Sequence, residues 1–489
     1  MQEAGATPEQ ELAFALATAT AVLDDLQGKV PEEHFSEMVG RISFFVNAGI
    51  RFVTEMCKMR AFVDLWDQIC RDRYGVVDPK MRRFRYGVQV NSLGLTEQQP
   101  ENNVYRILIE MLAVTLSKKA RARAVQLPAW NEALGLPRPW DQQWSLRMQQ
   151  IMAFETDILE YEDLFDGNPA VERKVASLKE GALAELALID GMGGAVEAIG
   201  YMKSRLVESN ASRIGQIESG EMTVVGVNTY QTGEPSPLTT GEDAVMNVDP
   251  ATEAEQISRL NIWRASRNPA AIQQALDQLR KAAVDGSNIM PPSITAAKAG
   301  VTTGEWADVV RQVFGQYRGP TGVRTSPSNS TEGLDEIRES VATVSKKLGR
   351  KLKFLMGKPG LDGHSNGAEQ IATRARDCGM EISYEGIRLT PKEIVAAAQD
   401  GQVHVIGLSV LSGSHISLMQ DVMTKLEQAN LGHIPVVVGG IIPEDDADQL
   451  REMGISRVYT PKDFELNQIM SDIVSLADPD HQAGPIAAQ

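Results

Sequence analysis

A short loop near the C-terminal end of the chain holds residue types that could bind a metal ion. It runs from Lys358 to Gly367 and reads KPGLDGHSNG, with Asp362 two residues before His364. An imidazole on such a loop can present one ring nitrogen to a ligand. A carboxylate that accepts the other ring N–H fixes the tautomer and raises the basicity of the imidazole. Lys358 could pair with that carboxylate. Three glycines would let the backbone approach a bulky ligand closely, namely Gly360, Gly363 and Gly367.

This loop follows the first strand of a regular alternation of strands and helices. Five helix patterns begin near Ala368, Lys392, His415, Glu444 and Phe464. The strand candidates before them are 352–356, 381–386, 403–410, 434–438 and 457–459. This alternation predicts a doubly wound parallel sheet of flavodoxin type, in which ligands bind outside the carboxyl ends of the strands. We therefore expect the site in loops 357–367, 409–414 and 439–443.

Small and polar residues recur at the same predicted edge of the sheet. They are Ser409, Leu411, Gly439, Gly440, Tyr459 and Thr460. Together with the loop, these residues resemble the DxHxxG…SxL…GG signature of the cobalamin-binding domains in methionine synthase and the acyl-CoA mutases. The alternative for His364 alone is an ordinary solvated histidine.

The resemblance implies a role for each of these positions. His364 would be the axial cobalt ligand, in place of the dimethylbenzimidazole of cobalamin. The displaced nucleotide tail would lie along Ser409, Leu411, Gly439 and Gly440. Asp362 and Lys358 would support the histidine. Gly363, Gly367, Tyr459 and Thr460 would complete the cofactor-binding site.

Short buried strands alternate with long helices in the N-terminal part as well. Apolar runs at 42–46, 84–90 and 120–127 predict three strands, and helical spacing predicts helices from Pro8 to Lys29 and from Phe52 to Arg71. Such βα units predict a parallel α/β layer or barrel. A (β/α)8 barrel needs eight strands, so we expect the C-terminal part of a TIM-type barrel.

Several strings in this part resemble the catalytic chain of methylmalonyl-CoA mutase and its relatives. They include VGRISFFVNAG, RARAVQLPAWNEALGLPRPWDQQWSLRMQQ and EYEDLFDG, which are most similar to the ethylmalonyl-CoA mutase branch. The resemblance implies a radical rearrangement of ethylmalonyl-CoA to methylsuccinyl-CoA with adenosylcobalamin. By position, it implies a catalytic and substrate-binding role for Gln89. Arg41 and Ser43 would bind acyl-CoA, and Glu3 and Glu132 would lie near the adenosyl group. Solvated polar residues at strand ends are the alternative.

Gly87 bears on the choice of substrate. Methylmalonyl-CoA mutases have a histidine two residues before the glutamine, where this chain has Gly87. Loss of an imidazole would open space for one more methylene in the acyl chain. Gly87 therefore favours ethylmalonyl-CoA, and methylmalonyl-CoA is the second candidate. A glycine in a strand can also mark a bulge or a close backbone approach.

The resemblance leaves other family features outside this sequence. A Tyr-His pair would stand immediately before Met1, and five barrel strands would precede it. We expect an N-terminally incomplete mutase that binds cobalamin but does not turn over substrate alone. A non-catalytic cobalamin-binding subunit is the alternative. A receiver-like signalling domain is disfavoured because the third strand of the C-terminal sheet ends in Ser409-Val410-Leu411, without a phosphoacceptor aspartate.

The composition of the chain limits which partners and which cellular compartment are possible. The net charge of −17 and the lack of a basic stripe argue against nucleic acid as a partner. No apolar run approaches the ~20 residues of a membrane span. Three cysteines without a CxxC pair favour a reducing cytoplasm. We expect a partial barrel at 1–225, a linker region with helices at 226–345, a cobalamin-binding domain at 346–480 and a flexible tail at 481–489. Within the linker region, we expect one helical stretch from 253 to 283. The family also suggests a homodimer and a G-protein-type repair chaperone.

Overall fold

The computed structural model describes residues 1–234, 236, 238, 246, 249–323, 334–361, 363–410, 415–460, 463 and 465–480. Asp362, Leu411 and the predicted tail at 481–489 lie outside the described residues. The chain divides into two compact units, one formed by Met1–Met246 with Pro320–Gln489 and the other by Asn247–Gly319. None of the described helices is long and apolar enough to cross a membrane.

A three-stranded parallel sheet lies in the N-terminal part of the first unit. Its strands are β1 (Phe44–Ala48), β2 (Tyr86–Val90) and β3 (Ala124–Gln126), paired in that order. Each strand is followed by a helix: α3 (Phe52–Asp72), α4 (Asn102–Thr115) and α5 (Pro139–Phe154). The predicted parallel βα layer is confirmed. The expected strand 120–127 is shorter in the structure, because its first residue belongs to the 3-10 turn η3 (Lys118–Ala120).

One face of this sheet is buried under helices. Val46 and Val88 point into a core formed with α1 (Pro8–Leu26), α3 and α6 (Pro169–Gly191). Helix α1 begins where Thr7 and Gln10 form a capping box and Pro8 occupies the first turn. The rest of this part comprises η1 (Gln2–Ala4), α2 (Glu32–Val39), η2 (Ser92–Gly94), η4 (Glu132–Leu134), η5 (Ile158–Glu160) and α7 (Ile199–Glu218).

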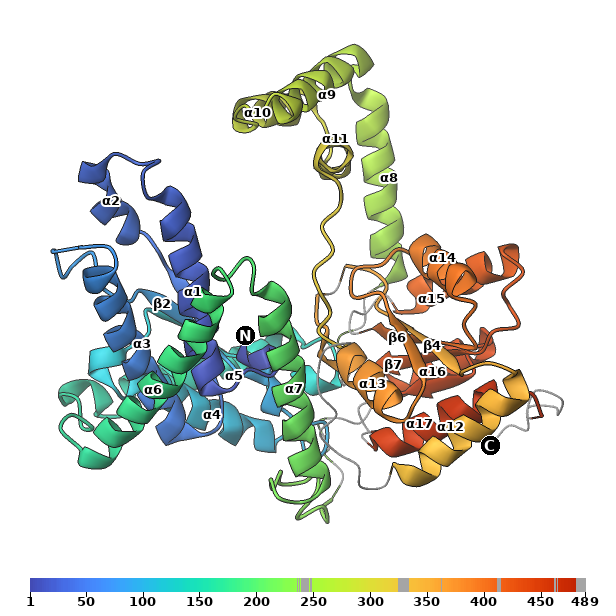
Figure 1. Cartoon of the computed structure of the whole chain (residues 1–489), viewed down its shortest axis with the longest axis horizontal. Helices are drawn as coiled ribbons and strands as arrows, with labels where there is room; N and C mark the ends of the chain where they lie inside the picture. The colour runs from blue at the N-terminus through green and yellow to red at the C-terminus, as the bar shows by residue number, and fades with distance from the viewer. Residues whose placement is uncertain are drawn as a thin grey trace. The chain divides into compact units, whose positions relative to one another are not determined.

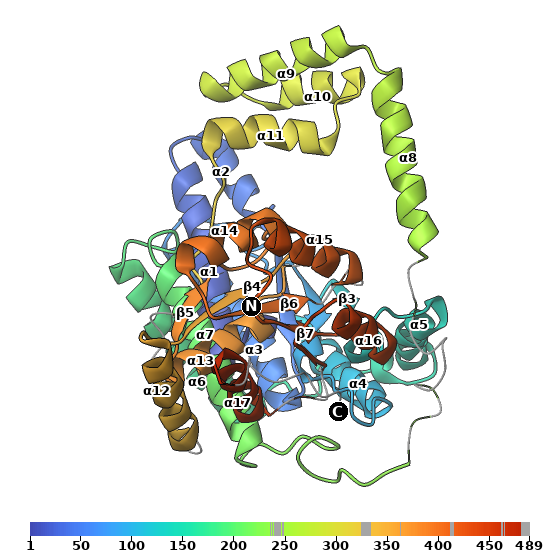
Figure 2. The same ribbon diagram turned by 90° about the vertical axis from the view of Figure 1, so that its right-hand side faces the viewer.

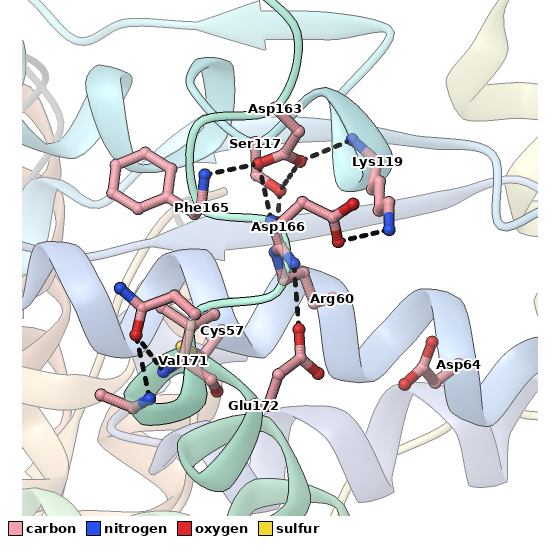
Figure 3. Close-up of polar contacts among 12 residues, drawn as sticks. Cys57, Arg60, Asp64, Ser117, Lys119, Asp163, Phe165, Asp166, Val171 and Glu172 are labelled. Carbon is pink, nitrogen blue, oxygen red and sulfur yellow. Dashed lines mark hydrogen bonds and ion pairs between the residues drawn. The ribbon is translucent and has the colours of Figure 1, made fainter.

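A polar cluster attaches the segment before α6 to α3 (Figure 3). Arg60 donates from Nη2 to Asp163 Oδ1 over 2.7 Å and from Nε to Ser117 Oγ over 3.0 Å. Asp163 also accepts from the backbone N–H of Lys119 and Phe165. Burial acts to raise the pKa of Asp163, but these donors outweigh it and lower the pKa. These contacts of Asp163 therefore hold the EYEDLFDG segment against α3.

The C-terminal part of the first unit contains the predicted doubly wound sheet. Its strands pair in the parallel order β5-β4-β6-β7-β8, which confirms the flavodoxin-type topology. They are β4 (Lys353–Gly357), β5 (Glu381–Tyr384), β6 (Val405–Val410), β7 (Val436–Gly440) and β8 (Arg457–Tyr459). The intervening helices are α13 (Asn366–Asp377), α14 (Pro391–Gly401), α15 (His415–Gln428), α16 (Glu444–Glu452) and α17 (Leu466–Ala477).

Helices cover both faces of this sheet (Figure 1). One core joins the strands to α13, α17 and α12 (Asp335–Leu348), and the other joins them to α14, α15 and α16. Helix α12 begins 11 residues before residue 346, where the sequence places the start of this domain, yet its Ile337 and Val341 lie in the same core.

The second unit is helical. It contains α8 (Pro250–Ser266), α9 (Pro269–Val284), α10 (Met290–Ala299) and α11 (Thr303–Phe314), and α9 lies beside α10 and α11 (Figure 2). The single helical stretch expected from 253 to 283 is wrong. Asn268 caps a new helix there and Pro269 occupies its first position, because proline cannot continue the preceding helix.

Candidate functional site

His364 lies where the sequence predicts it, in the loop between β4 and α13. The histidine and the adjacent Gly363 are exposed, whereas Lys358, directly after β4, is fully buried. Lys203 of α7 contacts the residues that follow the histidine. Its Nζ is 2.5 Å from Glu369 Oε1 and donates to Ser365 Oγ over 3.2 Å. The loop therefore presents an imidazole to the surface beside a buried lysine and a partly buried ion pair.

Strand register brings the small residues of the carboxyl edge together. Ser409 of β6 pairs with Gly439 of β7, and Gly439 pairs with Tyr459 of β8. Among the described residues, a Cβ on Gly367 would meet only Ser409 Oγ, at 3.8 Å, and a Cβ on Gly439 would meet only Tyr459, at 3.6 Å or more. As far as the described part of this edge shows, these positions border open space next to the His364 loop.

Gly440 has a different role from Gly439. A Cβ on Gly440 would lie 1.7 Å from the carbonyl oxygen of Val410, so only glycine allows β7 to pair with β6 here. Tyr459 donates its hydroxyl to Asp472 of α17 over 3.2 Å, away from the neighbouring strand. The backbone N–H of Thr460 donates to Asp463 Oδ2 over 2.7 Å.

The predicted residues of the barrel part form a second group. Gln89, near the carboxyl end of β2, donates to Glu3 Oε1 over 3.0 Å. Ser92 donates to the same oxygen from its hydroxyl and its backbone N–H. Burial and the Glu3 carboxylate raise the pKa of Glu132, while the Ser92 side chain and His364 act to lower it. Glu3, Gln89, Glu132 and His364 therefore share one electrostatic environment.

One contact joins this group directly to the His364 loop. The side-chain amide of Asn366, two residues after His364, donates to the backbone carbonyl of Glu3. Asn366 and Ser92 were not predicted as site residues. Ser92 could have been found from its place directly after a strand, whereas the contact of Asn366 requires the folded structure.

Arg41 and Ser43 lie apart from Gln89. Both are exposed at the amino end of β1, whereas Gln89 lies near the carboxyl end of β2. Ser43 alternates with Phe45 and Asn47 on the face of the sheet that also carries Gly87 and Gln89. The structure thus places Ser43 and Gln89 toward opposite ends of one face of the sheet, and Arg41 in the turn before β1.

A buried polar network lies beneath the Glu3 group. Lys58 is 2.5 Å from Glu11 Oε2 and 2.6 Å from Glu55 Oε2, and it donates to the carbonyl of Asn47. Gln2, the neighbour of Glu3, accepts from Lys58 and donates to Glu55. These bonds fix the start of the chain against β1.

The carboxyl edge of the doubly wound sheet fits a large ligand that brings a metal ion. Open space borders Gly367 and Gly439, and one exposed imidazole stands beside it. Small residues next to a single nitrogen donor suit cobalamin, whose macrocycle supplies the other cobalt ligands. A βα barrel sheet followed by such a domain defines the class of cobalamin-dependent acyl-CoA mutases, which are isomerases.

Comparisons with known proteins agree with this class. The methylmalonyl-CoA mutase family model matches residues 1–316, and the B12-binding domain model matches residues 352–462. The chain therefore belongs to the methylmalonyl-CoA mutase family, whose cofactor is adenosylcobalamin.

Individual relatives define the similarity further. Ethylmalonyl-CoA mutase of Cereibacter sphaeroides is 73% identical over 478 residues, which cover 98% of this chain and 73% of that protein. Ethylmalonyl-CoA mutase of Methylorubrum extorquens is 61% identical over 482 residues, which cover 98% of this chain and 70% of that protein. Methylmalonyl-CoA mutase of Cereibacter sphaeroides is 32% identical over 468 residues, which cover 94% of this chain and 64% of that protein.

Proposed function

We propose that this protein rearranges ethylmalonyl-CoA to methylsuccinyl-CoA. The observation that carries the proposal is the hydrogen bond from Asn366, two residues after His364, to Glu3, because Glu3 also accepts from Gln89 and so joins the substrate face of the barrel sheet to the cobalamin loop. The high identity to two ethylmalonyl-CoA mutases supports this substrate. When bound, adenosylcobalamin supplies the radical that abstracts a hydrogen atom from the substrate.

In this proposal the cobalamin domain binds and orients the cofactor. His364 would hold the cobalt of the cofactor through an imidazole nitrogen. Ser409 and Gly439 line the space for the nucleotide tail, into which any larger side chain at Gly439 would project. Gly363, Gly440 and Thr460 shape the backbone of the same edge. Asp362 and Leu411 are proposed cofactor residues by family position alone.

The barrel residues hold the reacting groups. Ser92 and Gln89 both donate to Glu3, which fixes that carboxylate near the adenosyl group. The raised pKa of Glu132 keeps its proton to a higher pH than in water, so this carboxyl group can donate a hydrogen bond. Arg41 and Ser43, at the far end of the same sheet, bind the CoA part.

Methylmalonyl-CoA is the second candidate substrate, because the chain is 32% identical to a methylmalonyl-CoA mutase. A homodimer is proposed as the assembly. It is supported by exposed apolar side chains on and after α5, namely Leu146, Ile151, Phe154 and Leu159. A G-protein-type repair chaperone stays a prediction from the family. A reducing cytoplasm is supported by three buried thiols without disulfide partners.

The cofactor role of His364 is tested by electron paramagnetic resonance. Uniformly 15N-labelled protein is loaded with unlabelled cob(II)alamin. We expect the doublet splitting of a 15N ligand from the protein, and a triplet from 14N would show that the cofactor keeps its own base. His364→Ala should abolish the doublet. His433→Ala is the matched control, since it removes an exposed histidine before β7, at the opposite edge of the sheet.

The substrate is tested by competition. Equal ethylmalonyl-CoA and methylmalonyl-CoA are incubated with the adenosylcobalamin-loaded chain, and in parallel with the chain plus an N-terminal polypeptide that ends in the Tyr-His pair. We expect mostly methylsuccinyl-CoA from the combination. Mostly succinyl-CoA would favour the second substrate. Cobalamin binding without product in either mixture would favour the non-catalytic subunit.

A further inference from the structure

An aromatic side chain stands exposed in the middle of the proposed substrate face. Phe45 of β1 is 61% exposed, while Phe44, Val46, Asn47 and Ala48 of the same strand are buried. In the sheet, Phe45 pairs with Gly87, and Gly87 pairs with Ala124. A large apolar side chain therefore stands at one end of a row whose other two members are small.

The Phe45 ring lies over the backbone of Gly87. A Cβ built on Gly87 would be 3.1 Å from Cδ2 and 3.2 Å from Cε2 of the ring, and its next neighbour would be the Ala124 carbonyl oxygen at 3.7 Å. Any side chain at position 87 must therefore push the ring away. Methylmalonyl-CoA mutases have a histidine where this chain has Gly87, and its loss was expected to open space for the substrate. In the structure the Phe45 ring borders that space, and the lack of a side chain at Gly87 leaves room for the ring.

The row lies next to the residues that the proposed reaction uses. One step toward the carboxyl ends, Asn47, Gln89 and Gln126 form a polar row in the same register. Side chains two residues apart on a strand share a face and are roughly 6.6 Å apart. Gln89 in turn donates to Glu3. A short alkyl branch on a group held near Gln89 thus reaches the Phe45 ring.

We propose that Phe45 is a specificity-determining residue for the alkyl branch of the acyl-CoA substrate, and that Gly87 holds its ring in position. The inference rests on the proposed function. The ring forms an apolar wall, and a branch that is longer by one methylene buries more surface against it. One buried methylene corresponds to about four-fold tighter binding. Ethylmalonyl-CoA should therefore bind about four-fold tighter than methylmalonyl-CoA.

The experiment measures affinities by calorimetry on the cobalamin-loaded chain. The ligands are CoA, methylmalonyl-CoA and ethylmalonyl-CoA. The variants are Phe45→Ala, Phe45→Leu, Gly87→Ala and the double variant Phe45→Ala/Gly87→Ala. Val77→Ala is the control, because it truncates an equally apolar, exposed side chain outside the strands.

We expect Phe45→Ala to reduce the four-fold preference to about one while the affinity for CoA stays unchanged. Phe45→Leu keeps an apolar wall and should retain about a two-fold preference. It also supplies the test if the alanine variant does not fold. Gly87→Ala should weaken ethylmalonyl-CoA binding by displacing the ring. In the double variant this added loss should vanish, because no ring remains to be displaced.

The possible failures are distinguishable. A wild-type chain that binds no CoA compound would overturn the proposed function and this inference with it. Wild-type binding of both esters with equal affinity, or an unchanged preference in Phe45→Ala and Phe45→Leu, would overturn the role of Phe45 and leave the function standing. Strictly additive effects of Phe45→Ala and Gly87→Ala would overturn the coupling between ring and glycine.

Discussion

The two parallel sheets of the first unit differ in how many of their faces are covered by helices. The five-stranded sheet has helices on both faces, and every residue of β6 is buried. The three-stranded sheet is buried on one face only, while its other face shows Phe45 and Ala124 to solvent. In the first case ligand-binding residues remain only at the strand ends. In the second, they extend along a whole face.

This difference determines where charge is buried. The doubly wound sheet has apolar cores on both faces, and its lysines at the amino edge are partly exposed, as in the pair of Lys353 with Glu381. The three-stranded sheet instead buries Lys58 with Glu11 and Glu55 below its carboxyl edge. The partly exposed Lys353–Glu381 pair should therefore contribute less to stability than the buried Lys58 cluster, although the doubly wound sheet also buries Lys358 at its carboxyl edge.

The largest expected effect comes from Lys58→Met. Burial acts to lower the pKa of Lys58, but the Glu11 and Glu55 carboxylates outweigh it and raise the pKa, so the lysine is charged. Its removal leaves two carboxylates buried without a cation, which should cost about 3–5 kcal/mol. The measurement is urea unfolding. Lys353→Met should cost no more than about 1 kcal/mol, because the Lys353 side chain is 25% exposed and its partner Glu381 is 51% exposed. Equal losses of unfolding free energy from both variants would contradict the proposed difference between the Lys58 cluster and the Lys353–Glu381 pair.

The same contrast explains what the sequence could reveal. Strands buried on both faces give continuous apolar runs, so β6 and the position of Ser409 at its end were predictable from local pattern. The partners of Lys58 were not, because a lysine and two glutamates in helical patterns look like solvated residues until the helices pack. The break at Pro269 was visible in Asn268-Pro269 and was missed.

Contacts over long sequence separations mark the limit of that reasoning. The topology of a parallel sheet places Gln89 at a carboxyl end, but its bond to Glu3 joins residues that are 86 positions apart. Only the family resemblance suggested that both lie near the cofactor. Likewise, the resemblance to methylmalonyl-CoA mutases, which have a histidine at this position, indicated open space beside Gly87, whereas the structure shows the Phe45 ring there.

A pair of glycine variants tests the doubly wound sheet with a smaller effect. Gly440→Ala places a Cβ against the Val410 carbonyl, where neither backbone can move freely, and should cost at least about 1–3 kcal/mol of stability. Gly439→Ala makes only ordinary contacts with Tyr459, so its melting temperature should stay near that of the wild type. It should still bind cobalamin more weakly, because its methyl group projects into the open space. Loss of stability in Gly439→Ala with unchanged cobalamin affinity would remove Gly439 from the site.

The pH dependence of stability tests the buried charge in the barrel part. Glu110 of α4 is 1% exposed, and its Oε2 has no hydrogen-bond partner among the described residues. Burial, and then the Glu55 carboxylate, raise its pKa to about 9 from 4.5, against the lowering effect of Arg106. Between these two values the folded chain holds a proton that the unfolded chain has released. Stability therefore falls as pH rises through this window, by up to about 1.4 kcal/mol per pH unit.

Glu110→Gln removes that titration. The stability of the variant relative to the wild type should rise steadily between pH 5 and pH 8, by up to about 1.4 kcal/mol per pH unit, as measured by urea unfolding at each pH. Glu197→Gln is the matched control, since it makes the same substitution at an exposed position. A constant difference for Glu110→Gln would show that Glu110 is ionised in the folded protein. The barrel part would then hold one more buried negative charge beside Glu55, and the contrast with the doubly wound sheet would be larger than described.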